Sequence, residues 1–295
     1  MYRYNDYTII NKGGLMKVKF KGKTYKSYQD VLDKLYKDKP ITLLTMGESN
    51  SKLKKGITET MSVAIMHLLP HDLADTLMER SIKRTLCPFA IMGDCWRPCL
   101  NTAGRGGIIT KGDTTNTIEL ARLRRTLFYL DNRQEFLEKL YNEIQKFVTK
   151  CEKNNIKPCI RLNGTSDIQW ETIKLDNGNT IFEEFPSVQW YDYTKIPTRK
   201  VEHIKNYHLT WSYSEANQKY ANYWKEAVSK GMNIAVVFRK DLPKSYKNMP
   251  VINGDKTDMR FKDPIGVIVG LKAKGKARKD TSGFVVDVDN AIAIN

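Results

Sequence analysis

Short apolar runs recur through the second half of the chain at a spacing that fits one β-strand and one helix per repeat. The runs, each followed by polar residues, are PCIRLNGTSD (158–167), SVQWYDYTK (187–195), YHLTWSYSE (207–215), NIAVVFRKD (233–241) and GVIVGLKAK (266–274). Their starts lie 20 to 33 residues apart. This alternation indicates βα units and therefore a parallel sheet. The segment IAVVF is apolar on both faces, as a strand must be when both sides of its sheet are covered.

No GxGxxG motif follows any of these runs, which argues against a nucleotide-binding doubly wound sheet. We therefore predict an α/β protein with a (β/α) barrel-like parallel sheet, either closed or partial. The earlier apolar run SVAIMHLL (62–69) fits a strand or a buried helix, and residues 117–152 fit two helices. Residues 214–231 fit one helix, with Ser214 as its N-cap and Gly231 at its C-terminal end.

The N-terminal part follows a different pattern. The segment MKVKFKGKTYKSY (16–28) alternates apolar and basic side chains around the turn KGK, which is typical of a two-stranded ribbon. The following segment YQDVLDKLYKDK has apolar residues at helical spacing. We therefore expect an N-terminal hairpin and helix extension, residues 1–40, and a barrel-like domain, residues 41–295, that carries the cysteine cluster.

Polar side chains at the carboxyl ends of barrel strands converge on one mouth, where the active sites of such proteins lie. The candidate residues in this position are Asn163, Ser166, Asp167, Asp192, Lys195, Ser212 and Glu215. Turns after strands favour polar residues in any protein. However, Asn-Gly-Thr-Ser-Asp and Asp-Tyr-Thr-Lys place several functional groups where one turn residue would suffice. We therefore expect these side chains to line a pocket.

Three cysteines, Cys87, Cys95 and Cys99, lie close together in the segment CPFAIMGDCWRPC. A disulfide is the weakest interpretation, because the cysteine count of five is odd and the N-terminus lacks the layout of a signal peptide. Thiolates select zinc or iron–sulfur clusters. Zinc needs a fourth ligand, which His67 or His71 supplies only if the chain folds back. Three cysteines suit a [4Fe–4S] cluster with one open iron, and unligated thiols are the remaining alternative.

Positive charge is abundant, with a formal net charge of +16 and a pI near 9.5. This balance favours phosphate-rich partners, although lysine is spread along the whole chain. Arg105 follows the cysteines in a glycine-rich segment, and Arg122 and Arg125 share one face of a predicted helix. The densest group, the C-terminal basic turn, consists of Lys272, Lys274, Lys276, Arg278 and Lys279. No apolar stretch is long enough for a membrane span, so we expect no membrane contact.

Several segments, taken in order, resemble the uncharacterised phage gene product 88 family. They are CPFAIMGDCWRPCLNTAGRG, ARLRRTLFY, RLNGTSDIQWE, VQWYDYTK, NYHLTWSYSE, NIAVVF and GVIVGLKAKGKARKDTSGFVV. Together they extend from about residue 60 to residue 286 and are specific as a set. The resemblance implies a phage-encoded protein of the host cell cytoplasm, and it implies no particular activity.

The leading hypothesis is an iron–sulfur enzyme similar to radical S-adenosylmethionine enzymes, which bind their cluster with three cysteines at the mouth of a partial barrel. Their usual C-x3-C-x2-C spacing differs from C-x7-C-x3-C here. Cys87, Cys95 and Cys99 would bind the cluster. Cofactor contacts would come from Asn163, Ser166, Asp167 and Arg105, and substrate contacts from Asp192, Lys195, Ser212 and Glu215. Arg105 and the basic turn suit a phosphate-bearing substrate, such as a nucleotide or a nucleic acid.

Two other functions fit the same residues. One is a non-enzymatic nucleic-acid-binding phage protein that binds through Lys272 to Lys279 and whose thiols hold zinc or nothing. The other is a hydrolase or transferase that uses Asp192 and Glu215 as acid and base.

Overall fold

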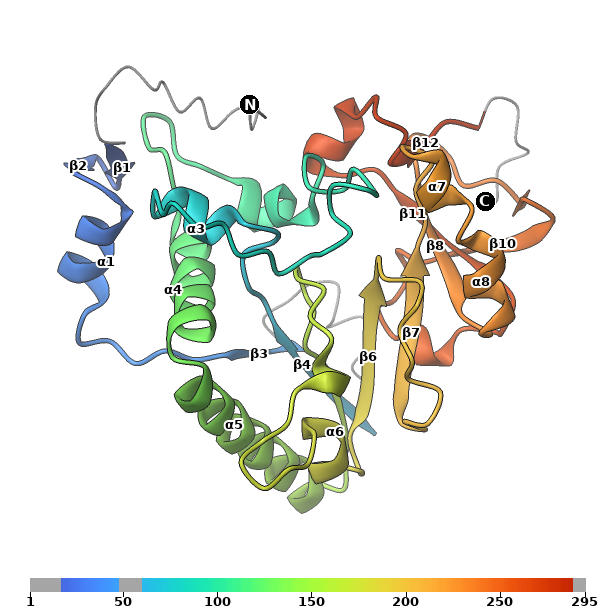
Figure 1. The fold of residues 1–295 in the computed structure, drawn as a ribbon, viewed down its shortest axis with the longest axis horizontal. Helices are drawn as coiled ribbons and strands as arrows, with labels where there is room; N and C mark the ends of the chain where they lie inside the picture. The colour runs from blue at the N-terminus through green and yellow to red at the C-terminus, as the bar shows by residue number, and fades with distance from the viewer. Residues whose placement is uncertain (1–16, 48–59, 289–295) are drawn as a thin grey trace.

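The computed structural model describes residues 17–47 and 60–288 (Figure 1). The strands are β1 (Val18–Phe20), β2 (Lys23–Tyr25), β3 (Leu44–Met46), β4 (Met61–Met66), β5 (Lys157–Arg161), β6 (Gln189–Thr194), β7 (Tyr207–Ser212), β8 (Asn233–Phe238), β9 (Ser245–Tyr246), β10 (Met249–Asn253), β11 (Ile268–Lys272) and β12 (Val285–Val286). The α-helices are α1 (Tyr28–Tyr36), α3 (Leu73–Leu77), α4 (Thr117–Asp131), α5 (Arg133–Lys153), α6 (Ile181–Glu184), α7 (Gln218–Ala221) and α8 (Trp224–Ser229). Short 3₁₀ helices are η2 (Leu100–Thr102), η3 (Gly104–Gly107), η4 (Trp170–Thr172), η5 (Arg260–Lys262) and η6 (Gly275–Lys279).

A mostly parallel sheet forms the centre of the protein. Its strand order is β3-β4-β5-β6-β7-β8-β11-β10-β9, and β12 pairs with β8. Strands β4 to β7 each pair in parallel with the next strand along the chain, and β11 continues the sheet in parallel with β8. All five apolar runs in the second half of the chain contain strands of this sheet, as predicted. The run 62–69 also contains a strand, β4.

The predicted barrel is not confirmed, because the sheet stays open. Antiparallel strands flank it on both sides, with β3 paired to β4 and β9 paired to β10. Within the described residues, β3 and β9 are the two ends of the strand path and do not pair with each other. The central strands follow one another in chain order, as strands of a barrel do, whereas each edge of the sheet is an antiparallel strand, β3 or β9.

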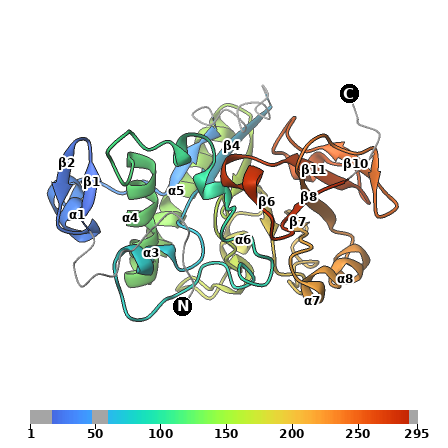
Figure 2. The same ribbon diagram turned by 90° about the horizontal axis from the view of Figure 1, so that it is seen from above.

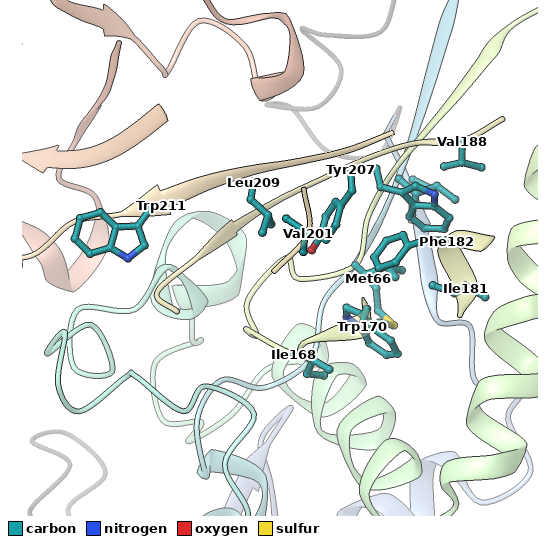
Figure 3. Packing of buried hydrophobic residues seen from close by; sticks show 14 of the residues in the cluster. Met66, Ile168, Trp170, Ile181, Phe182, Val188, Val201, Tyr207, Leu209 and Trp211 are labelled. Atoms are coloured by element: carbon teal, nitrogen blue, oxygen red, sulfur yellow. The ribbon is translucent and has the colours of Figure 1, made fainter. Parts of the chain in front are cut away.

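The two faces of the sheet bury different layers. On one face, strand residues such as Ile160 and Trp190 pack with apolar residues of α5, α6 and α7 in the main hydrophobic core. Figure 3 shows part of this core, where Phe182 of α6 stacks on Tyr207 of β7. On the other face, Cys159 and Tyr191 pack under Met259, next to η5. Both faces are therefore covered, which explains why the strands are apolar throughout.

The helix predicted over 214–231 is wrong in its extent, since two short helices occupy this region. Asn217, not Ser214, caps α7, and its side chain accepts hydrogen bonds from the backbone N–H groups of Lys219 and Tyr220. The Ser214 hydroxyl instead accepts from the backbone N–H of Ala216, in the turn after β7. Gly231 has a φ of +72° and follows α8, so the predicted C-terminal stop is correct.

The N-terminal hairpin is present, with β1 antiparallel to β2. Apolar residues of the hairpin and α1, including Phe20 and Val31, pack against Leu120 and Leu123 of α4. Figure 2 shows the hairpin and α1 beyond α4, at one end of the molecule. Residues 1–16 of the predicted extension lie outside the described residues.

Candidate functional site

The segment with the three cysteines lies at the carboxyl ends of the parallel strands. In Figure 1 the arrowheads of β6 and β7 point towards the teal part of the chain, which contains this segment. Just after β5, the backbone N–H of Asp167 donates to the carbonyl of Leu86 at 2.9 Å. After β6, Lys195 packs so closely on Gly93 that a Cβ there would lie 3.1 Å from Cδ of the lysine. The cysteine segment is therefore fixed against this edge of the sheet, which we call the rim.

The three thiols are half-buried and close enough to affect one another electrostatically. Burial raises the pKa of Cys87 well above its usual range, the charge of Asp167 raises it further, and Cys95 and Cys99 would add to this if they were ionised. Burial also raises the pKa of Cys95 to about 12 and raises that of Cys99. Without a positive partner, these thiols would stay protonated near neutral pH.

Several positive groups and N–H donors face the sulfurs. The backbone N–H of His71 donates to Sγ of Cys87 at 3.3 Å, and that of Asn101 donates to Sγ of Cys99 at 3.5 Å. The charge of Lys195 lowers the pKa of Cys95, and the charge of Arg122 lowers that of Cys99. These contacts lower the pKa of the thiols and so favour the thiolate form. Burial raises the pKa by more, so the net shift is upward.

The rim residues are not arranged as a metal site in this structure. In the part of the chain that the structure describes, no group of three or more His, Cys, Asp or Glu side chains is arranged to hold a metal ion. His71 lies beside Cys87, so the chain does fold back as a zinc site with a histidine ligand requires. However, the Nδ1 atom of His71 lies 3.1 Å from the Thr85 hydroxyl and 3.8 Å from a carboxylate oxygen of Asp72.

The predicted cofactor residues after β5 are buried. The Asn163 side chain accepts from the hydroxyl of Ser166 and from the backbone N–H of Ile168, so it shapes this turn. One oxygen of Asp167 accepts from the Thr194 hydroxyl, and the other accepts from the backbone N–H of Lys195. Burial raises the pKa of Asp167, while nearby Arg199 lowers it. These three residues connect the rim ends of β5 and β6.

The predicted substrate residues divide into two groups. Asp192 is buried on the face that carries the main core, where it accepts from the backbone N–H of Asn163 and the hydroxyl of Tyr207. Burial raises the pKa of Asp192 to about 7, and the charge of Arg161 opposes this rise. Glu215 is exposed after β7, and its carboxylate accepts from Tyr246. The structure thus places the acid and base of the hydrolase alternative in different environments.

Lys195 and Ser212 meet at the rim. The ammonium of Lys195 donates to the backbone carbonyls of Ser212 and Tyr213 at 2.8 and 3.1 Å. It also lies over the rings of Tyr220 and Phe284. Burial lowers the pKa of Lys195 to about 8, while the charges of Cys95 and Asp167 raise it. Lys195 is therefore a predicted substrate residue whose charge acts on a rim thiol, that of Cys95.

The predicted cationic residues are only partly gathered. Arg122 reaches the rim, where it donates to the side-chain oxygen of Asn101 at 2.5 Å, whereas Arg125 donates to the carbonyl of Thr42. Arg105 is exposed on η3. In the basic turn, Lys276 lines a small hollow of about 30 Å³ beside Cys99, Trp96 and Arg97.

Two lysines of the basic turn are neutralised. Lys272 and Lys274 form ion pairs with Asp241 and Asp255, at 3.0 and 2.6 Å. Strand β11 ends at Lys272, so Lys274 and Lys276 do not continue the alternating face that a longer strand would give. Lys276, Arg278 and Lys279 lie instead on η6, which contacts η2 next to the cysteines.

Arg199 is an important buried residue that the sequence pattern did not indicate, and Arg161, at the end of β5, takes part in a similar buried ion pair. Arg161 pairs with Asp258 at 3.0 Å, and Arg199 pairs with Glu171 and lies 3.6 Å from Asp167. Their partners lie 28 to 97 residues away along the chain, so no local motif marks them.

His67, at the rim end of β4, gives the structure a testable dependence on pH. Burial lowers its pKa from 6.5 to about 3, helped by the charges of Arg122 and Arg161. As the pH falls below 6.5, the unfolded chain takes up a proton that the folded chain rejects until about pH 3. Stability is therefore lost as the pH falls through this window.

We expect His67 alone to lower the free energy of unfolding by about 2 kcal/mol between pH 8 and pH 5. Urea denaturation of the wild type and of His67→Gln at both pH values measures this. In the variant, the change in the free energy of unfolding between pH 8 and pH 5 should be smaller by about 2 kcal/mol. An unchanged difference would show that His67 is not held neutral.

The fold and the rim define a mixed α/β protein with a thiol cluster at the carboxyl edge of an open parallel sheet. Residues 42–288 match the gene product 88 family, so the chain belongs to this phage family. The match begins after the N-terminal hairpin and α1. No curated protein and no solved structure matches the chain. No helix among the described residues is long and apolar enough to cross a membrane.

Proposed function

We propose that the protein is an iron–sulfur enzyme of the radical S-adenosylmethionine type, with Cys87, Cys95 and Cys99 as the ligands of a [4Fe–4S] cluster. The observation that carries this proposal is the gathering of the three thiols at the rim of a sequentially ordered parallel sheet. Backbone N–H groups and two cations face the sulfurs there. Proteins set the reduction potential of such clusters partly through hydrogen bonds to the cysteine sulfurs.

A cluster requires its three cysteine sulfurs to be less close together than a single zinc ion does. Tetrahedral zinc with Zn–S bonds of about 2.3 Å needs sulfurs about 3.8 Å apart. Each cysteine of a cluster binds its own iron, so the sulfurs stay further apart. The described residues contain no compact three-ligand group, yet the thiols influence one another's ionisation. The segment between Leu77 and Leu100 contains no helix or strand, so its backbone can adjust between the fixed points at Leu86 and Gly93 when a cluster binds.

The donor set fits the cluster chemically. Three soft thiolates satisfy three irons, and the fourth iron is left for an amino acid group of S-adenosylmethionine. When bound and reduced, such a cluster supplies an electron that cleaves the sulfonium of this cofactor. Metal binding displaces the protons of the three thiols, and the positive charge of the irons would offset the cost of burying the resulting thiolates.

The residues around the thiols have defined roles in this proposal. Asn163, Ser166 and Asp167 hold the turn after β5 in place, which positions the rim next to the cysteines. Lys195 places a buried positive charge beside Cys95. On the outer side of the rim, Arg105 and Lys276 offer positive charge to a phosphate-bearing substrate.

Cleavage of S-adenosylmethionine tests the proposal directly. The iron-loaded wild type, reduced with dithionite, should convert the cofactor to methionine and 5′-deoxyadenosine in equal amounts, measured by chromatography. Cys99→Ser should reduce both products by more than about 100-fold, because a lost ligand removes the cluster. Wild-type protein that carries the cluster but yields neither product would exclude this enzyme class.

A further inference from the structure

A hollow of about 450 Å³ lies between the N-terminal hairpin and the loop that precedes α4. Figure 2 shows these two segments side by side, with the hairpin in blue and the loop in green. Lysines line both sides of the hollow. The lining residues are Lys19, Lys21, Gly22, Thr24, Thr110, Lys111, Gly112 and Asp113.

Hydrogen bonds fix the two walls against each other. Lys19 and Thr114 are joined twice, since the N–H of Lys19 donates to the Thr114 hydroxyl and the N–H of Thr114 donates to the Lys19 carbonyl. At the hairpin turn, the backbone N–H groups of Lys21 and Gly22 donate to the two oxygens of Asp113 at 2.9 and 3.1 Å. These hydrogen bonds hold the backbone of Lys19 and Lys21 in place against the loop.

The hairpin presents an unusually dense positive surface. Residues 17–26 contain five lysines and no acidic residue, and all five lysines are exposed. Side chains of a strand alternate between its two faces. Val18, Phe20 and Tyr25 pack into the core with α1 and α4, which leaves the lysines on the outer face. Asp113 is the one carboxylate of the hollow, and both of its oxygens accept from backbone N–H groups.

This surface differs from the basic turn in its ion pairs. Lys272 and Lys274 of the basic turn are paired with carboxylates. In contrast, no carboxylate among the described residues lies within 4.0 Å of the ammonium groups of Lys19, Lys21 or Lys111. Unpaired ammonium groups that line a concave surface attract phosphate more strongly than paired ones.

We propose that this hollow, which we call the hairpin hollow, binds the phosphate backbone of a nucleic acid duplex. Lysine ammonium groups bind phosphates as point charges and read no sequence, so the contact is independent of base sequence. The aromatic residues of the hairpin, Phe20 and Tyr25, are buried, so they offer no stacking platform for unpaired bases. A duplex, whose bases are already stacked, therefore suits this surface better than a single strand.

Half of the hollow lies outside the part of the chain that matches the family. The match covers residues 42–288, so it includes Lys111 but neither Lys19 nor Lys21. The hairpin thus adds a binding surface to the family domain of this chain. The proposal stands apart from the cluster at the rim, because none of the lining residues belongs to the cysteine site.

Fluorescence anisotropy of the full chain with labelled 20-base-pair DNA and RNA duplexes, at 50 to 200 mM salt, tests this surface. Neutralising Lys19, Lys21 and Lys111 together (each Lys→Gln) should weaken duplex binding more than about tenfold at 100 mM salt. The slope of log affinity against log salt should flatten by about 2 to 3 units, because each lost phosphate contact contributes about 0.9. The two duplexes should behave alike, and both should bind more tightly than a single strand.

Two matched triple variants serve as controls, with thermal melting to establish that each one folds. Neutralising Lys146, Lys150 and Lys153, which are on α5, removes the same charge far from the hairpin and should leave the slope nearly unchanged. Neutralising Lys272, Lys274 and Lys276 tests the basic turn as the rival surface. The proposal is overturned if the wild type binds no duplex at 50 mM salt. It is equally overturned if either control weakens binding as much as the hairpin variant does.

Discussion

Replacing Arg199 with methionine is expected to lower the free energy of unfolding by about 3 to 5 kcal/mol. The Arg199 side chain is fully buried and donates to Glu171 at 2.9 Å and to the hydroxyl of Tyr207 at 2.8 Å. It also lies 3.6 Å from Asp167. Methionine fills a similar volume, so the main effect is the loss of the positive charge between two buried carboxylates. Urea denaturation at pH 7 measures the change.

A second substitution shows whether charge is the cause. Arg199→Met combined with Glu171→Gln should recover part of the stability, because one of the two uncompensated carboxylates becomes neutral. Lys174→Met provides the comparison, since it breaks an ion pair with Glu183 whose side chains are both more than half exposed. Such an exposed pair contributes little to the free energy of unfolding. A loss for Arg199→Met as small as that of Lys174→Met would contradict the assigned role of the buried network.

The largest chemical effect is expected at the three rim cysteines. Changing Cys87, Cys95 or Cys99 singly to serine should lower the iron content of anaerobically reconstituted protein from about four ions per chain to less than about one. Serine keeps the size and polarity of the side chain but removes the soft sulfur ligand. Iron analysis and the absorbance of the protein in the visible region measure this loss.

Cys151 supplies the matched control for these substitutions. It is buried at the end of α5 in the main core, as a small apolar residue would be. Cys151→Ala should therefore keep the full iron content even if it lowers the melting temperature. If single serine variants retained iron, or if Cys151→Ala lost it as fully, the assignment of the ligands would be wrong.

The strands were predictable because local sequence determines them. IAVVF and the other apolar runs carry the residues that a covered sheet needs, and each contains a strand. Strand β10 was missed, because MPVIN is short, contains a proline and lies next to the edge strand β9. The open form of the sheet depends on its two antiparallel edge strands, β3 and β9, and on the missed strand β10, which connects β9 to β11. No feature of the apolar runs themselves indicates where such edges form.

The candidate site was predictable in part for similar reasons. Cys87, Cys95 and Cys99 are neighbours in sequence, and the rule that strand ends converge was enough to place them near Lys195. The buried ion pairs were not predictable, because Arg161 and Asp258 are 97 residues apart and no local pattern connects them. The same holds for Asp192, whose burial follows from its side of β6 and not from its position near the strand end.

The iron and acid-labile sulfide content of the anaerobically purified wild-type protein tests the central claim most directly. Coordination of a cluster by the sulfurs beside the sheet edge predicts about four iron and four sulfide ions per chain. One zinc ion per chain, or protein without metal in which Cys87, Cys95 and Cys99 all react freely with a thiol reagent, would contradict it.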